Sequence, residues 1–145
     1  MTVHVRFHQT FPLRVAEWFL AMVAMVWGLI VASNPGMFQE NPSFRAMLNM
    51  APQGVWGWTA ATVGAIGLSA LTVNGAWRST PHIRAVCAFM RCLLWAHIIT
   101  GLSGSGAPTT GLAVYPGMLI LEVFNTFRAM ADARASDEYA RLAKE

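Results

Sequence analysis

The stretch VWGWTAATVGAIGLSALTVNGAW, residues 55–77, decides the fold. It carries no charged residue, and a membrane crossing needs about 20 mostly apolar residues, so it predicts a membrane-spanning helix. Small residues recur within it at alternating spacings of three and four residues, the repeat of helices that cross at about +20°. Because helices in lipid pack through small residues that let their backbones approach, we expect the packed face to contain Gly57, Ala60, Gly64 and Gly67.

Three further stretches have the length of a membrane span: residues 13–31, 83–102 and 112–130. The last two contain charged residues, so their prediction rests on length and flanking loops. The whole chain is 55% hydrophobic and only 12% charged, whereas a soluble domain is roughly 25% charged. We therefore predict one domain, residues 1–145, that is an all-α polytopic membrane protein: an antiparallel bundle of four transmembrane helices.

Lysine and arginine predict the orientation of these spans. Two arginines precede or begin the first span, two lie around the loop between the second and third, and four basic residues lie at the end of the fourth span or after it, whereas the other side has only Arg45. The positive-inside rule then places both termini in the cytoplasm. The outer loop, residues 33–54, should contain a short interfacial helix with Asn41 as cap and Pro42 in its first turn. The tail, residues 131–145, should continue the fourth helix into the cytoplasm.

Polar side chains lie on the predicted packed faces of the spans, and the topology places them at a similar depth. A charged side chain near the bilayer centre costs at least about 2.5–3.5 kcal/mol and needs a partner. We therefore predict that Arg91 pairs with Glu122 and that Arg84 pairs with Glu17. The first span offers the small residues that match the glycine-rich face, namely Ala21, Ala24 and Gly28, and the polar cluster consists of Arg91, Glu122, Glu17, Arg84, Asn74 and Asn125.

Two interpretations of the polar cluster follow. Ionisable groups inside spans often mark a proton or ion path or a polar binding pocket. Buried polar groups can instead fix the register of packed helices. Because the cluster offers as many bases as acids, the structural clamp is the favoured interpretation.

Other chemistry is not expected from this sequence. No nucleophile with a paired base, phosphate-binding loop or zinc spacing is visible, so we expect neither an enzyme nor a metal or other cofactor. The basic residues are dispersed rather than clustered, which argues against a nucleic-acid partner. A haem between helices would need a second intramembrane histidine beside His97, and the predicted spans offer none, so we expect no haem site. Trp95 is expected to face lipid.

Several strings of the chain resemble a group of small four-span membrane proteins encoded by tailed bacteriophages and prophages. These strings are VWGW at residues 55–58, NGAWRSTPHIRA at 74–85, GLAVYP at 111–116, and LE, N, RA and DAR between residues 121 and 134. The resemblance implies a setting in the bacterial cytoplasmic membrane during infection. It transfers no activity.

Three functions fit that setting. The favoured one is a non-enzymatic interaction or exclusion protein that forms homo-oligomers in the bilayer or binds a host or phage membrane protein through the loop 33–54 or the tail. A holin-like pore former is the second. A small proton-coupled transporter that uses Glu17 or Glu122 as its carrier site is the third.

Overall fold

The computed structural model describes residues 14–76 and 81–143, and the described residues form helices without any strand. Four long helices are joined by short connections, apart from a segment of three short helical elements between the first two. In chain order the elements are α2 (Val15–Ser33), α3 (Met37–Glu40), η2 (Pro42–Phe44), α4 (Arg45–Met50), α5 (Gln53–Ala76), α6 (Pro81–Gly104) and α7 (Gly111–Leu142).

Three of these helices are long and apolar enough to cross a membrane: α2, residues 53–73 of α5, and α6. The ends of α2, α5 and α6 lie within two residues of the ends of the predicted spans. The fourth predicted span corresponds to the first twenty residues of α7, which do not reach the same apolarity. Pro116, Glu122, Asn125 and Arg128 all fall within that stretch and lower its mean hydropathy.

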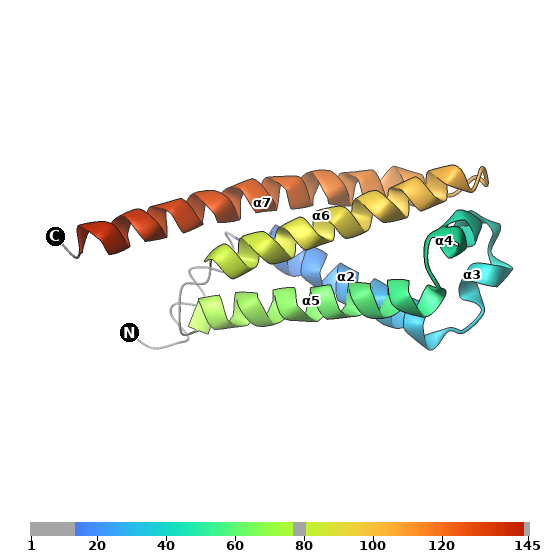
Figure 1. Ribbon diagram of the computed structural model, residues 1–145, viewed down its shortest axis with the longest axis horizontal. Coiled ribbons are helices and arrows are strands. Elements are labelled where there is room, and N and C mark those ends of the chain that lie inside the picture. Colours follow the sequence, from blue (N-terminus) through green and yellow to red (C-terminus); the bar gives the residue numbers. More distant parts are fainter. Residues whose placement is uncertain (1–13, 77–80, 144–145) are drawn as a thin grey trace.

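The four long helices form one bundle, in which α2 packs most closely with α5 and α6 with α7 (Figure 1). The α2–α5 contact is the small-residue face predicted from the sequence. A Cβ atom added to Gly28 would lie 2.2 Å from the backbone nitrogen of Ala61, and one added to Gly64 would lie 2.4 Å from that of Met25. Glycine is therefore required at these two crossings. The predicted face residues Ala21, Ala24, Gly28, Gly57, Ala60, Gly64 and Gly67 are all buried.

An aromatic cluster fills the bundle between α2, α6 and α7. Trp95 is 0% exposed and stacks on Tyr115 with ring centroids 5.6 Å apart, while Trp27 meets Trp95 edge-on at 6.5 Å. The Trp27 indole N–H also donates to the Tyr115 hydroxyl at 3.0 Å. The prediction that Trp95 faces lipid was wrong. Trp95 follows Arg91 by four residues, which places both side chains on the same buried face of α6.

The segment between α2 and α5 folds into a cap over one end of the bundle (Figure 1). As predicted, the Asn41 side chain caps this segment by accepting from the Ser43 N–H at 3.0 Å, and Pro42 occupies the first turn. Phe38 and Phe44 stack at 4.5 Å. These contacts give the cap an apolar underside that packs on the core.

Three side chains fix the cap to the long helices. Met47 is fully buried and lies directly over Gly101 of α6, where a Cβ atom would meet its Cγ at 2.3 Å. The Trp56 indole N–H of α5 donates to the carbonyls of Met47 at 3.1 Å and Ala51 at 3.2 Å. The Gln53 amide donates to carbonyls at the end of α2. Packing and hydrogen bonds together close this end of the bundle.

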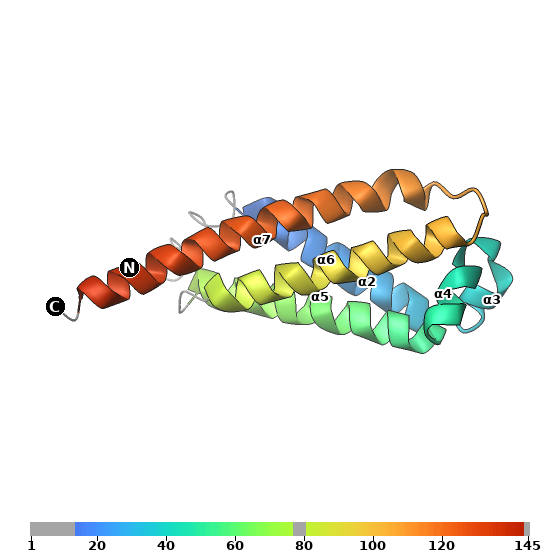
Figure 2. The same ribbon diagram turned by 45° about the horizontal axis from the view of Figure 1, so that its top comes forward.

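The last part of α7 extends beyond the other long helices, at the end of the bundle opposite the cap (Figure 2). The helix is unbroken from Gly111 to Leu142, which confirms that the tail continues the fourth helix. His82 at the start of α6 lies 3.2 Å from the Asp137 carboxylate of this extension. The outermost turns otherwise carry exposed side chains.

Candidate functional site

The first element of the candidate site is a buried ion pair between α6 and α7. The Arg91 guanidinium donates from Nε to Glu122 Oε1 and from Nη2 to Glu122 Oε2, the second contact at 3.2 Å. The Arg91 side chain is 2% exposed and that of Glu122 is 0% exposed. This is the pairing that the sequence predicted, in a two-point geometry that Arg favours with carboxylates.

The surroundings of this pair are shaped for it. The Asn125 amide, one turn along α7, donates to Glu122 Oε2 at 3.5 Å. On the opposite side, a Cβ atom added to Gly67 of α5 would lie 2.4 Å from Arg91 Nη1, so this glycine makes room for the guanidinium. Nη1 is buried and has no hydrogen-bond partner among the described residues. The guanidinium is thus held through two of its three nitrogens.

The second element is an ion pair that joins three helices near the end opposite the cap. Arg84 of α6 donates from Nε to Glu17 Oε2 at 2.9 Å and from Nη2 to Glu17 Oε1 at 2.5 Å, which confirms the second predicted pairing. Its Nη1 donates to Asp132 of α7 at 3.0 Å. Arg84 therefore ties α6 to α2 and to α7 at once.

Sequence reasoning missed Asp132. A signal for it was present, because the buried positions of α7 at Glu122, Asn125 and Ala129 continue at the same alternating spacing to residue 132. Asp132 is 40% exposed and also lies 3.8 Å from Arg14. Partial burial lowers the pKa of Arg14, and the neighbouring Arg84 acts in the same direction.

The predicted cluster therefore divides into two levels instead of one. Arg84 and Arg91 are seven residues apart on α6, about 10 Å at 1.5 Å per residue. The described acids Glu17, Glu122 and Asp132 each bind an arginine, and Asn125 joins the inner pair. The side chain of the remaining predicted member, Asn74, lies outside the described residues.

Charge compensation determines what this site can do. Both oxygens of each buried carboxylate accept a hydrogen bond from a guanidinium, so each acid is paired with a charge of opposite sign. Such a group is a poor carrier for a proton or a cationic substrate. The geometry is that of a connection between helices, which agrees with the clamp interpretation.

Comparisons of the chain with protein-family models, with curated proteins and with solved structures find no match. The described residues therefore define the class of protein by their architecture: a helical bundle in which three helices are long and apolar enough to cross a membrane and whose interior contains two arginine–carboxylate pairs.

Proposed function

We propose that this chain is a small non-enzymatic membrane protein that crosses the bacterial cytoplasmic membrane four times and acts by binding further copies of itself in the bilayer. Both termini lie in the cytoplasm in this proposal. The observation that carries it is the contrast within α7. One face of this helix binds the bundle through Glu122, Asn125 and Ala129, while the opposite face is left exposed along its length.

The exposed face of α7 supports a fourth membrane span. Ile120, Phe124 and Phe127 are between 61% and 69% exposed, while the Glu122 and Asn125 side chains between them point into the bundle. Mean hydropathy counts these inward polar groups, but lipid would contact only the outward side chains. A helix whose central charge, Glu122, is paired inside the bundle is compatible with a bilayer. The distribution of basic residues supports the orientation.

The closed interior favours a binding function over the two alternatives. A proton-coupled carrier needs an acid that can lose its partner and reach water, whereas Glu122 is fully buried and bound to Arg91. A holin-like pore needs a polar face that can line water, and the cap closes one end of the bundle through Met47 and Trp56. Each alternative would require the bundle to open first.

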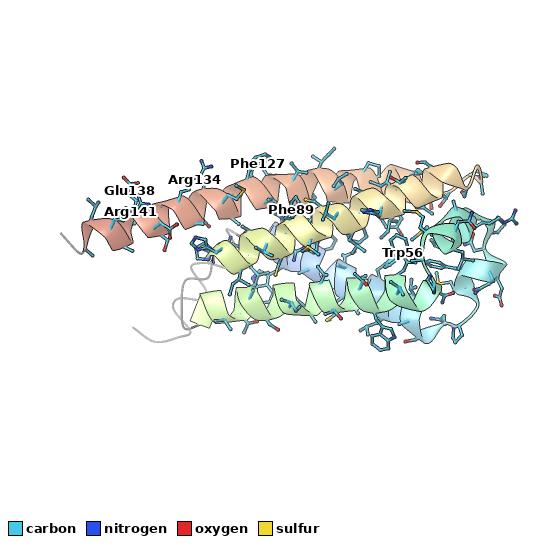
Figure 3. The ribbon with its side chains drawn as sticks, in the orientation of Figure 1. Trp56, Phe89, Phe127, Arg134, Glu138 and Arg141 are labelled. Atoms are coloured by element: carbon cyan, nitrogen blue, oxygen red, sulfur yellow. The ribbon has the colours of Figure 1, made fainter. Side chains whose placement is uncertain are left out.

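Self-association is supported by the pattern of the outward face. Its residues follow one another at spacings of four and three, the repeat of a two-helix seam. The seam is apolar alongside the bundle and ends with exposed charged residues beyond it. Figure 3 shows Phe127 and Arg134 on the side of α7 that points away from the bundle. We name this set the α7 outer face: Ile120, Phe124, Phe127, Ala131, Arg134, Glu138 and Arg141.

The test is disulfide formation between copies in native membranes. Both native cysteines, Cys87 and Cys92, are buried and would be replaced by alanine. Phe127→Cys and Arg134→Cys should then form cross-linked dimers on mild oxidation, while Ser69→Cys on the exposed side of α5 should not. No cross-link at either α7 position would refute self-association through this face.

A second readout separates the alternatives. Membrane potential and release of a cytosolic enzyme should stay unchanged when the protein accumulates in bacteria. Abrupt depolarisation with enzyme release would favour the holin-like alternative instead. The bacteriophage setting is supported by the sequence strings alone. A host or phage membrane protein would be the binding partner if the outer face cross-links to another protein but not to itself.

A further inference from the structure

A groove on the outer surface between α5 and α6 is separate from the ion pairs and from the α7 outer face. Its volume is about 250 Å³, and its walls are mainly apolar side chains, among them Val63, Met90 and Leu93. These two helices pack together less closely than α2 with α5 or α6 with α7. The groove lies on the surfaces of two helices that are long and apolar enough to cross a membrane. It is therefore open to molecules dissolved in the bilayer.

His97 at the wall of this groove has a defined orientation. Its Nδ1 lies 2.7 Å from the carbonyl oxygen of Leu93, one turn earlier on α6. A carbonyl oxygen only accepts, so Nδ1 carries the hydrogen and the neutral ring has its lone pair on Nε2. No described residue donates a hydrogen bond to Nε2. The groove thus contains a positioned hydrogen-bond acceptor.

His97 lies well inside the helix, so its Nε2 acceptor is energetically unfavourable in hydrocarbon when nothing donates a hydrogen bond to it. The residue lies seven positions before the end of α6 at Gly104, about 10 Å inside the helix end. Its side chain is exposed, and the neighbouring Phe89, Met90 and Leu93 on the same helix are exposed as well; Figure 3 labels Phe89. A polar group that faces hydrocarbon without a partner costs several kcal/mol. A ligand that donates a hydrogen bond would remove that cost.

The remaining groove residues restrict the head of such a ligand. Thr59 and Trp56 are the other polar side chains of the walls, and the Trp56 N–H is already bound to two backbone carbonyls. None of the described residues that line the walls is a lysine or arginine, so a phosphate headgroup would find no cation among them. An uncharged head with a hydroxyl donor fits both observations.

We infer that the α5–α6 groove binds a neutral membrane-dissolved alcohol, a molecule with a long apolar chain and an uncharged hydroxyl head. The hydroxyl donates to His97 Nε2, and the chain lies against Val63, Met90 and Leu93. This inference does not depend on self-association, because the groove and the α7 outer face are on different helices.

Photolabelling of the full-length protein in phosphatidylcholine nanodiscs tests the inference. The probe is hexadecan-1-ol with a diazirine in its chain, and the competitors are unlabelled hexadecan-1-ol and its methyl ether, which cannot donate. We expect label on peptides of α5 and α6, and competition by the ether that is about 2- to 10-fold weaker, the loss of one neutral hydrogen bond.

Variants separate the hydrogen bond from simple lipid contact. His97→Phe should abolish the preference for the alcohol over the ether, while His97→Gln, which keeps an acceptor, should retain part of it. Val63→Trp should fill the groove and reduce labelling of both helices, whereas Phe124→Trp on the α7 outer face should not. Equal competition by alcohol and ether in the wild type would overturn the inference, because it would mean ordinary lipid contact. Cross-links from the groove to a second copy in place of label would overturn it too.

Discussion

Replacing Arg91 by methionine removes the charge at the centre of the bundle and leaves an unbranched side chain in its place. Glu122 would then be a buried carboxylate without its cation, since its side chain is 0% exposed and water cannot replace the guanidinium. Two charge-assisted hydrogen bonds are lost, each worth about 1.5–3 kcal/mol. Breaking a buried pair by removing one partner typically costs about 3–5 kcal/mol. We expect Arg91→Met to lower the free energy of unfolding by that amount.

The double variant makes this a test of pairing rather than of packing. Arg91→Met with Glu122→Met removes both charges, and such replacements are often neutral or stabilising. The double variant should therefore be at least about 2 kcal/mol more stable than the sum of the single effects predicts. The same substitution at exposed Arg45 in the cap is the control and should stay within about 0.5 kcal/mol of the wild type.

The assay is equilibrium unfolding in mixed detergent micelles, followed by tryptophan fluorescence. Trp95 reports on the site directly, because it is fully buried one turn from Arg91 and stacks on Tyr115. Additive effects of the two single substitutions would refute the energetic coupling. A loss below about 1 kcal/mol in Arg91→Met alone would show that the pair does not stabilise the bundle.

Three further predictions use the same unfolding assay. Glu17→Gln should lower the free energy of unfolding by about 1–2 kcal/mol, less than Glu122→Gln, because Arg84 keeps a hydrogen bond to the partly exposed carboxylate of Asp132. An equal cost of the two substitutions would contradict this difference. Gly64→Ala should lower the free energy of unfolding by about 3 kcal/mol and reduce accumulation, since the added Cβ would overlap the backbone of α2. The control Gly117→Ala, on the open surface of α7, should be neutral or stabilise the protein by up to about 1 kcal/mol. Trp56→Phe leaves two cap carbonyls without their donor and should cost about 1–3 kcal/mol and speed proteolysis within residues 34–52, while Trp58→Phe, at a 62% exposed side chain, should change neither.

The helical parts of this fold were predictable because each depends on a local pattern. A run of apolar residues without charge defines a span by its length, and glycines at spacings of three and four define the face on which α2 and α5 meet. The partners of Arg84 and Arg91 were predictable for a related reason. A charge that cannot remain alone in a bilayer restricts its partner to the few acids on neighbouring packed faces, here Glu17 and Glu122.

Features that depend on the path of the whole chain could not be predicted in this way. The burial of Trp95 follows from the contact of α6 with Tyr115 of α7, and periodicity alone does not say which neighbour covers a helix face. The docking of Met47 on Gly101 joins two segments more than fifty residues apart. The groove beside His97 exists because α5 and α6 pack loosely, and sequence patterns indicate contacts better than gaps.

Close glycine packing joins α2 to α5, whereas the contact between this pair and the α6–α7 pair depends on a different force, and this difference explains where Arg84 lies. Glycine allows α2 and α5 to approach so closely that backbone contacts replace side-chain contacts. No comparable glycine face joins α6 to α2, where few residues meet. Arg84 supplies a connection there, through Glu17. A long, directed side chain bridges helices that small residues do not bring together, so Arg84 of α6 helps to fix the position of one helix pair on the other. Loss of Arg84 should therefore separate the pairs more than it loosens either one.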